Sequence, residues 1–70
     1  MHAYNLFRRK RKQDFYCAVP EDRAVPAFLH ADNWEFDRRV EETAGAPFGF
    51  DARAAQEGSR FIGFYLFQAV

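Results

Sequence analysis

Cysteine is scarce and long apolar runs are missing, and each of these absences excludes a class of protein. The single cysteine, Cys17, excludes an internal disulfide and leaves a zinc site without enough thiolate ligands. No run approaches the roughly 20 apolar residues of a membrane span, and no N-terminal stretch has the pattern of a secretory signal. The sequence therefore predicts a small, soluble, cytoplasmic domain.

Sequence motifs for catalysis or metal binding are missing as well. The stretch Gly45–Gly49 lacks the lysine that follows the glycines of a phosphate loop. His30 and Asp32 lie two residues apart, but a metal site needs three or four convergent ligands. Cys17 is expected to face the core, and no motif supports a nucleophile pair with His30. We therefore predict no enzymatic activity, no catalytic residue, no cofactor and no metal.

Aromatic residues are in excess. Nine Phe, three Tyr and one Trp are 19% of the 70 residues, and 49% of the chain is hydrophobic. This composition is too apolar for a disordered chain. The length allows one domain, 1–70, with a thin core that buries roughly 60% of the unfolded surface.

Basic charge is concentrated in one run of consecutive residues, Arg8, Arg9, Lys10, Arg11 and Lys12. Residues 1–13 hold five basic and no acidic residues, a charge of +5; the remaining five Arg against ten Asp and Glu give −5. The run is interpreted as a solvated hairpin loop, with a phosphate-binding patch and a nuclear-import signal as alternatives.

Three strands are predicted in the first 40 residues. Ala3–Arg9 and Asp14–Val19 form a hairpin around the polar loop 10–13, whose lack of glycine leaves the register open. Asn33–Val40 alternates apolar and polar residues, as a sheet with one wet face does. This alternation places Trp34 in the core. A single helical turn over Ala27–Asp32 is a further expectation.

One helix and a fourth strand are predicted next. The helix spans Asp51–Ile62, with Asp51 as N-cap and Gly63 after its end. Its core face consists of Ala54, Ala55, Gly58, Phe61 and Ile62. A shorter helix that stops at Gly58 is the alternative. The apolar run Phe64–Ala69 predicts a central strand. The fold class is α+β: a four-stranded, mostly antiparallel sheet of β-β-β-α-β order with one helix on one face.

Short residue groups spread over nearly the whole chain form a pattern. They are Tyr4, Phe7-Arg8-Arg9, Tyr16-Cys17-Ala18-Val19-Pro20-Glu21, Val25-Pro26, Asn33-Trp34-Glu35, Phe50-Asp51 and Gly63. This pattern resembles a family of short, uncharacterised proteobacterial proteins that carry a domain of unknown function. The resemblance implies a bacterial cytoplasmic protein and supplies no catalytic residue.

The aromatic excess suggests a binding surface. Pairing Arg9 with Asp14 places Phe7 and Tyr16 together on the sheet face away from the helix, unless the loop 41–50 covers them. We expect a protein-interaction domain that associates with itself or another protein there. The candidate partner-binding residues are Phe7, Tyr16, Arg8, Arg9, Lys10, Arg11 and Lys12. A single-stranded nucleic-acid-binding module that uses the same residues is the alternative, which the zero net charge disfavours.

Overall fold

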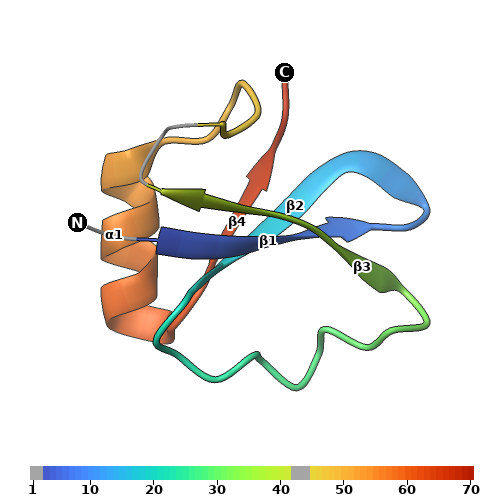
Figure 1. Ribbon diagram of the computed structural model, residues 1–70, viewed down its shortest axis with the longest axis horizontal. Coiled ribbons are helices and arrows are strands. Elements are labelled where there is room, and N and C mark those ends of the chain that lie inside the picture. The colour runs from blue at the N-terminus through green and yellow to red at the C-terminus, as the bar shows by residue number, and fades with distance from the viewer. Residues whose placement is uncertain (1–2, 42–44) are drawn as a thin grey trace.

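A four-stranded antiparallel sheet carries one helix in the computed structural model, which describes residues 3–41 and 45–70 (Figure 1). The strands are β1 (Ala3–Arg9), β2 (Lys12–Pro20), β3 (Trp34–Glu41) and β4 (Tyr65–Gln68). Their order in the sheet is β3-β1-β2-β4. The helix α1 (Ala52–Ile62) lies between β3 and β4 in sequence and contacts β4 and β2. The predicted fold class is confirmed.

The hairpin register differs from the predicted one by a single residue. Phe7 lies opposite Cys17, and Arg9 lies opposite Lys12 rather than Asp14. The reason is a turn of only two residues, 10 and 11, with an irregularity between Arg8 and Arg9. Because side chains alternate along a strand, this slip moves every β2 side chain to the other face.

The register between β1 and β3 also shifts, between Leu6 and Phe7, which leaves Asp37 opposite no residue of β1. Val40 therefore lies beside Tyr4, while Trp34 belongs to the core on the opposite face. The simple alternation predicted for this strand was wrong at this point. Trp34 is buried, as predicted, with 5% of its surface exposed.

The face that carries α1, here called the helix side, holds the larger core. Its buried residues are Tyr4, Leu6, Tyr16, Ala18, Val40, Ala55 and Phe67. Phe50 packs edge-on against Tyr4 and Phe67, with ring centroids 5.6 and 5.3 Å away. The described part of the preceding loop, 45–50, therefore packs on the helix side and not over the opposite face; 42–44 lie outside the described residues.

The opposite face, here called the far side, is covered in part by the segment that joins β2 to β3. Its buried residues are Cys17, Val19 and Trp34. Phe28, from the joining segment, packs edge-on against Trp34 and Phe64, at 6.2 and 5.0 Å between ring centroids. Figure 1 shows this segment as irregular coil along one border of the sheet. It contains turns in place of the predicted helical turn.

The ends of α1 are as predicted, but its buried face is only partly so. Asp51 accepts hydrogen bonds from the first turn, and Gly63 ends the helix with φ 86°. Phe61 and Ile62, predicted to be in the core, are 74% and 64% exposed. The helix lies so close to the sheet that a Cβ on Gly58 would stand 2.9 Å from the Phe64 carbonyl oxygen. Small residues therefore form the contact face.

Strand β4 is an edge strand and not the central strand that its apolar run predicted. It pairs with β2 alone within the described sheet. Phe67 faces the helix side, where it is buried, while Leu66 lies opposite Cys17 and is 43% exposed. The apolar composition of this strand has a cause on each face. The helix packs on one face, and on the other face Phe28 contacts Phe64, the residue before β4.

Candidate functional site

The two aromatic residues predicted to bind a partner together lie on opposite faces of the sheet. Phe7 is half-buried on the far side, 5.8 Å from the ring of Phe36. Tyr16 is only 6% exposed and stacks on Phe67 on the helix side, at 5.3 Å. The slip in the hairpin register separates them. Tyr16 therefore belongs to the core and is unavailable to a partner.

The basic run is divided as well. Arg8 points to the helix side, where it forms a 2.9 Å ion pair with Glu35, a bond that raises the pKa of Arg8. The Arg9 guanidinium lies on the far side, 5.4 Å from the Trp34 ring centroid. Lys10 and Arg11 are exposed in the turn, and Lys12 lies 3.5 Å from Asp14. Strand alternation thus prevents the five charges from forming one patch.

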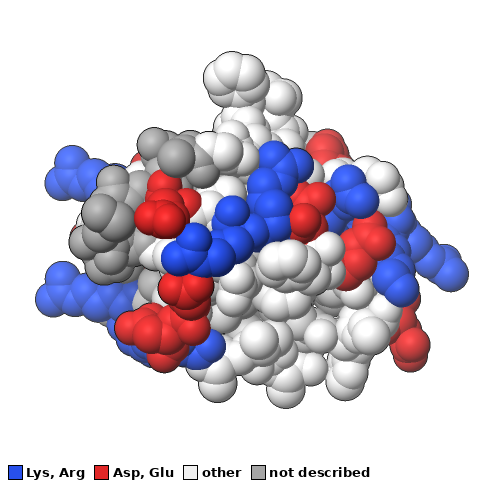
Figure 2. Space-filling model, viewed as in Figure 1, with Lys and Arg blue, Asp and Glu red and all other residues white. Residues whose placement is uncertain are grey.

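Charges of both signs are mixed on the surface. Figure 2 shows basic and acidic side chains interleaved across the strands, with uncharged surface over the segment between β2 and β3. Arg38 pairs with Asp37 and Arg39 with Glu21 and Glu41, all within 3.2 Å. Each of these carboxylates has a guanidinium beside it, so on the face shown in Figure 2 the two signs alternate.

An apolar surface on the far side is the first candidate site. It consists of Phe7, Phe28, Phe36 and Leu66, and it is called the far-face patch below. Phe36 is 58% exposed and Phe28 41% exposed. Within the patch, the ring centroids of Phe7 and Phe36 lie 5.8 Å apart, and Phe28 contacts Phe64, two residues before Leu66. Period-two alternation in β3 gives a sequence signal for the face of Phe36. The unbroken apolar run of β4 gives none for Leu66, and neither does the long segment that brings Phe28 to this face.

The two edges of the sheet differ in their protection. Strand β3 presents five charged residues, which oppose pairing with another strand. Strand β4 has none, and it adjoins the far-face patch at Leu66. The Ala69 N–H donates to the Asp14 carbonyl oxygen at 2.6 Å. In an antiparallel ladder every second residue bonds to the neighbouring strand, so Ala69 and Phe67 face β2. The backbone N–H and C=O of Leu66 therefore point outward, away from β2. This edge offers a hydrogen-bonding pair beside an apolar side chain.

A pocket of about 350 Å³ on the helix side is the second candidate site. It lies between α1 and the adjoining ends of β1 and β2, and Arg23, Ser59 and Arg60 are among its lining residues. The sequence does not predict it, because its lining comes from three separate parts of the chain: Tyr4, residues 20–23 and residues 56–60. The one local signal is Ser59, a polar residue that falls on the helix face turned to the sheet.

Reactive groups elsewhere offer little chemistry. Cys17 is fully buried, and burial raises the pKa of its thiol to about 12. The described residues contain no cluster of three potential metal ligands, and His30 is exposed. Within the same residues, no helix is long and apolar enough to cross a membrane.

Comparison with known proteins gives no relative from which a function could be transferred. No family model, no curated protein and no solved structure matches this chain. The resemblance to short proteobacterial proteins stays a prediction. The far-face patch and the pocket are therefore the features that point to function.

Proposed function

We propose that this chain is a protein-interaction domain that associates with a second copy of itself through the far-face patch. The observation that carries the proposal is the exposure of large apolar side chains on one sheet face: Phe36 at 58%, Leu66 at 43% and Phe28 at 41%. Exposed apolar surface of this kind on one face commonly marks an interface. A docked partner would shield these side chains from water.

The energetics favour docking at this face. A large apolar side chain that is fully buried contributes about 1.5–3 kcal/mol relative to one in water. Phe36 and Leu66 realise only part of that within the monomer, since each keeps roughly half of its surface exposed. Trp34 and Phe64 belong to the same side of the sheet and both contact Phe28, so the patch adjoins a packed layer. A preorganised surface loses little entropy on binding.

A second copy is the occupant that the charges fit best. The net charge is zero, so two copies feel no long-range repulsion. In a two-fold dimer the same surface meets itself, and an apolar patch is self-complementary without any charge pattern. The outward backbone groups of Leu66 give the border of the patch a self-complementary hydrogen-bonding pair, because antiparallel β4 strands can exchange both bonds.

The test is a double variant, Phe36→Ser with Leu66→Ser, studied by sedimentation velocity over a wide concentration range. The wild-type chain is expected to shift from monomer to dimer as concentration rises, and the variant to stay monomeric. Both positions are exposed, so the variant should still unfold cooperatively. A wild-type chain that is monomeric at every concentration contradicts the proposal.

The matched control is Phe61→Ser with Ile62→Ser. These residues are more exposed than the patch residues, at 74% and 64%, and they lie on the outside of α1. The control variant removes more exposed apolar surface than the patch variant, but from another place, so it should still dimerise like the wild type. If the control abolishes association and the patch variant does not, the interface lies on the helix.

The nucleic-acid alternative finds no stacking platform in this arrangement. It needs Phe7 and Tyr16 side by side next to the basic residues, but Tyr16 is buried on the other face. Arg8 is already paired with Glu35. Protein association is therefore the function that the geometry supports best.

A further inference from the structure

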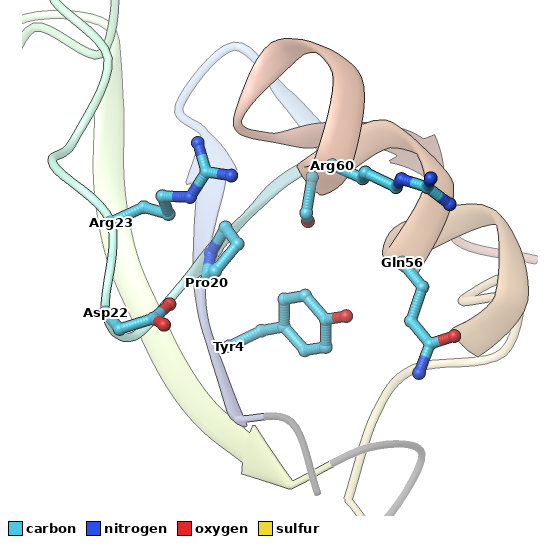
Figure 3. A pocket seen from close by; sticks show the side chains of 7 residues that line it. Tyr4, Pro20, Asp22, Arg23, Gln56 and Arg60 are labelled. Carbon is cyan, nitrogen blue, oxygen red and sulfur yellow. The ribbon is translucent and has the colours of Figure 1, made fainter.

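The pocket on the helix side has an apolar floor and polar walls. Figure 3 shows the Tyr4 ring between two groups of side chains, with Asp22 and Arg23 on one side and Gln56 and Arg60 on the other. Tyr4 is 2% exposed and is therefore part of the core beneath the pocket. The volume of about 350 Å³ is at the lower end of the range for small-molecule sites and is too small for a polymer.

The hydroxyl of Ser59 is the feature that marks this pocket as more than a surface irregularity. Ser59 is 92% buried, since 8% of its surface is exposed, and it lines the pocket. Its Oγ makes no hydrogen bond with any described residue. A buried hydroxyl without a partner opposes folding, and alanine at this helical position would avoid that cost. A ligand oxygen in the pocket would complete its hydrogen bonding.

Two arginines line the pocket, although the Arg60 guanidinium lies 5.6 Å from the exposed Phe61 ring and would turn inward to meet a ligand. Neither Arg23 nor Arg60 forms an ion pair among the described residues, whereas Arg8 and Arg39 are both tied to carboxylates. Arg23 lies against the end of α1, because its Nη1 is 3.7 Å from the Cβ position of Gly63. Guanidinium groups present several N–H donors in one plane, which suits a carboxylate or a phosphate.

We propose that this pocket binds a small organic oxyanion, a carboxylate or phosphate ester attached to a flat ring. The anionic group would lie between Arg23 and Arg60, within reach of the Ser59 hydroxyl. The ring would lie against Pro20, above the small part of Tyr4 that reaches the pocket. The class of ligand follows from two cationic side chains, a buried hydroxyl and an aromatic floor in a cavity of this size.

The remaining polar residues refine that class. Asp22 adds a carboxylate to the wall, so the two arginines and this acid leave a local charge of +1. A singly charged anion therefore fits better than a highly charged one. The Gln56 amide can donate and accept hydrogen bonds, so a ligand that carries a hydroxyl besides its anionic group finds partners on both walls.

The experiment is an NMR titration of the full chain at constant ionic strength with benzoate, phenyl phosphate and uncharged phenol. Benzoate and phenyl phosphate share the ring and differ in the oxyanion, so their relative affinities identify the preferred group. At least one should cause saturable shifts at Tyr4, Arg23 and Ser59, and phenol should not. If neither anion saturates, or if both act no more strongly than phenol, the proposal is wrong.

Arginine variants locate the anion. Arg23→Gln and Arg60→Gln should each weaken binding about tenfold, since each removes a charge-assisted contact. Arg53→Gln is the matched control, because Arg53 is exposed on the same helix, outside the pocket and without an ion pair among the described residues. It should leave the affinity within about twofold. Equal losses in all three variants, or shifts centred on Lys10 and Arg11, would show nonspecific attraction and overturn the site.

Ser59→Ala separates binding from folding. The variant removes the unsatisfied hydroxyl and adds a better helix former, so the thermal midpoint should stay the same or rise. Its affinity for the anion should nevertheless fall several-fold, about threefold or more. A variant that binds the anion as tightly as the wild type would show that Ser59 does not contact the ligand, and the proposed geometry would be wrong.

Discussion

The single tryptophan, Trp34, holds the far side of the molecule together. It is 5% exposed and contacts the rings of Phe15 and Phe28, at 5.9 and 6.2 Å between centroids. The Arg9 guanidinium lies over its ring. Because the segment that covers this face is anchored through Phe28, the loss of Trp34 would loosen both the strand and its cover.

We expect Trp34→Ala to lower the free energy of unfolding by about 3–5 kcal/mol, the usual cost of truncating a large buried aromatic. A domain of this size has only about 5 kcal/mol in total, so the variant should be mostly unfolded at room temperature. Phe36→Ala, on the same strand and face but 58% exposed, should cost about 1 kcal/mol or less. Urea denaturation measures both, and a wild-type midpoint for Trp34→Ala would place this residue outside the core.

The buried thiol of Cys17 predicts a pH dependence. Burial raises its pKa from 9.0 to about 12, so above about pH 9 the unfolded chain loses a proton that the folded chain keeps. The contribution of the Cys17 thiol to stability should therefore be constant below about pH 9 and should be lost as the pH rises toward about 12. Burial also raises the pKa of Tyr65, which acts in the same direction.

Cys17→Ala isolates the contribution of the thiol to the pH dependence. Denaturation between about pH 8 and about pH 11 should show a smaller loss of stability in the variant than in the wild type, with the Tyr65 contribution left in both. The comparison uses the change with pH, because the variant also loses some packing. Equal pH slopes in the two proteins would mean that the thiol titrates normally in the folded state.

At the scale of elements, Gly58 determines how the helix meets the sheet. Gly58→Ala adds about 1 kcal/mol of helix propensity, which would stabilise an isolated helix. In this fold the new Cβ would stand 2.9 Å from the Phe64 carbonyl oxygen, a backbone atom that cannot move cheaply. We expect a net loss of about 1–3 kcal/mol. Glu57→Ala, its exposed neighbour, should be within about 0.5 kcal/mol of the wild type, and a stabilised Gly58→Ala would contradict the close approach.

The ends of the helix could be predicted from local chemistry, and its buried face could not. Asp51 and Gly63 have side-chain and backbone properties that suit helix ends in any context, and both act as expected. The buried face depends on what the helix meets. Hydrophobicity favoured Phe61 and Ile62, but the short distance to the sheet leaves room only for small residues such as Ala55 and Ser59.

Strand positions were predictable to within a few residues, whereas register was not. Apolar and aromatic content identified Ala3–Arg9 with the right bounds. No glycine marks the turn, so nothing local distinguished a two-residue connection from a four-residue one, and one residue decides which face Tyr16 occupies. The shift at Asp37 has the same effect on Val40. Both irregularities arise from pairing between strands and leave no trace in either strand alone.

On the scale of the whole molecule, composition anticipated the apolar surface but not its members. Thirteen aromatic residues exceed what one helix and one sheet face require, and the excess is divided between the far side and the surface. Phe7 was correctly placed on the far side and Tyr16 was not. The pocket was not predictable, because Tyr4, Arg23 and Ser59 are brought together only by the complete fold.

The salt dependence of association distinguishes an apolar interface from a charged one. Raising the salt concentration from 0.1 M to 1 M shortens the Debye length from about 10 Å to about 3 Å, which screens most exposed charges. The net charge is zero and the far-face patch is apolar, so the dimerisation constant should change by less than about threefold. Lys10 and Arg11 project from the turn and can steer an approaching acidic surface, so most of this small change should come from a lower association rate.

Sedimentation equilibrium at both salt concentrations, with stopped-flow dilution for the rates, measures these two quantities. Lys10→Gln with Arg11→Gln should reduce the salt dependence of the rate and leave the dimerisation constant and the thermal midpoint unchanged, because both residues are exposed. A thymidine oligonucleotide serves as the opposite case, since its binding would weaken by orders of magnitude over the same range. Dissociation of the dimer at 1 M salt would show that ion pairs hold the copies together, and the interface would then lie among the charged residues of β3 rather than on the far-face patch.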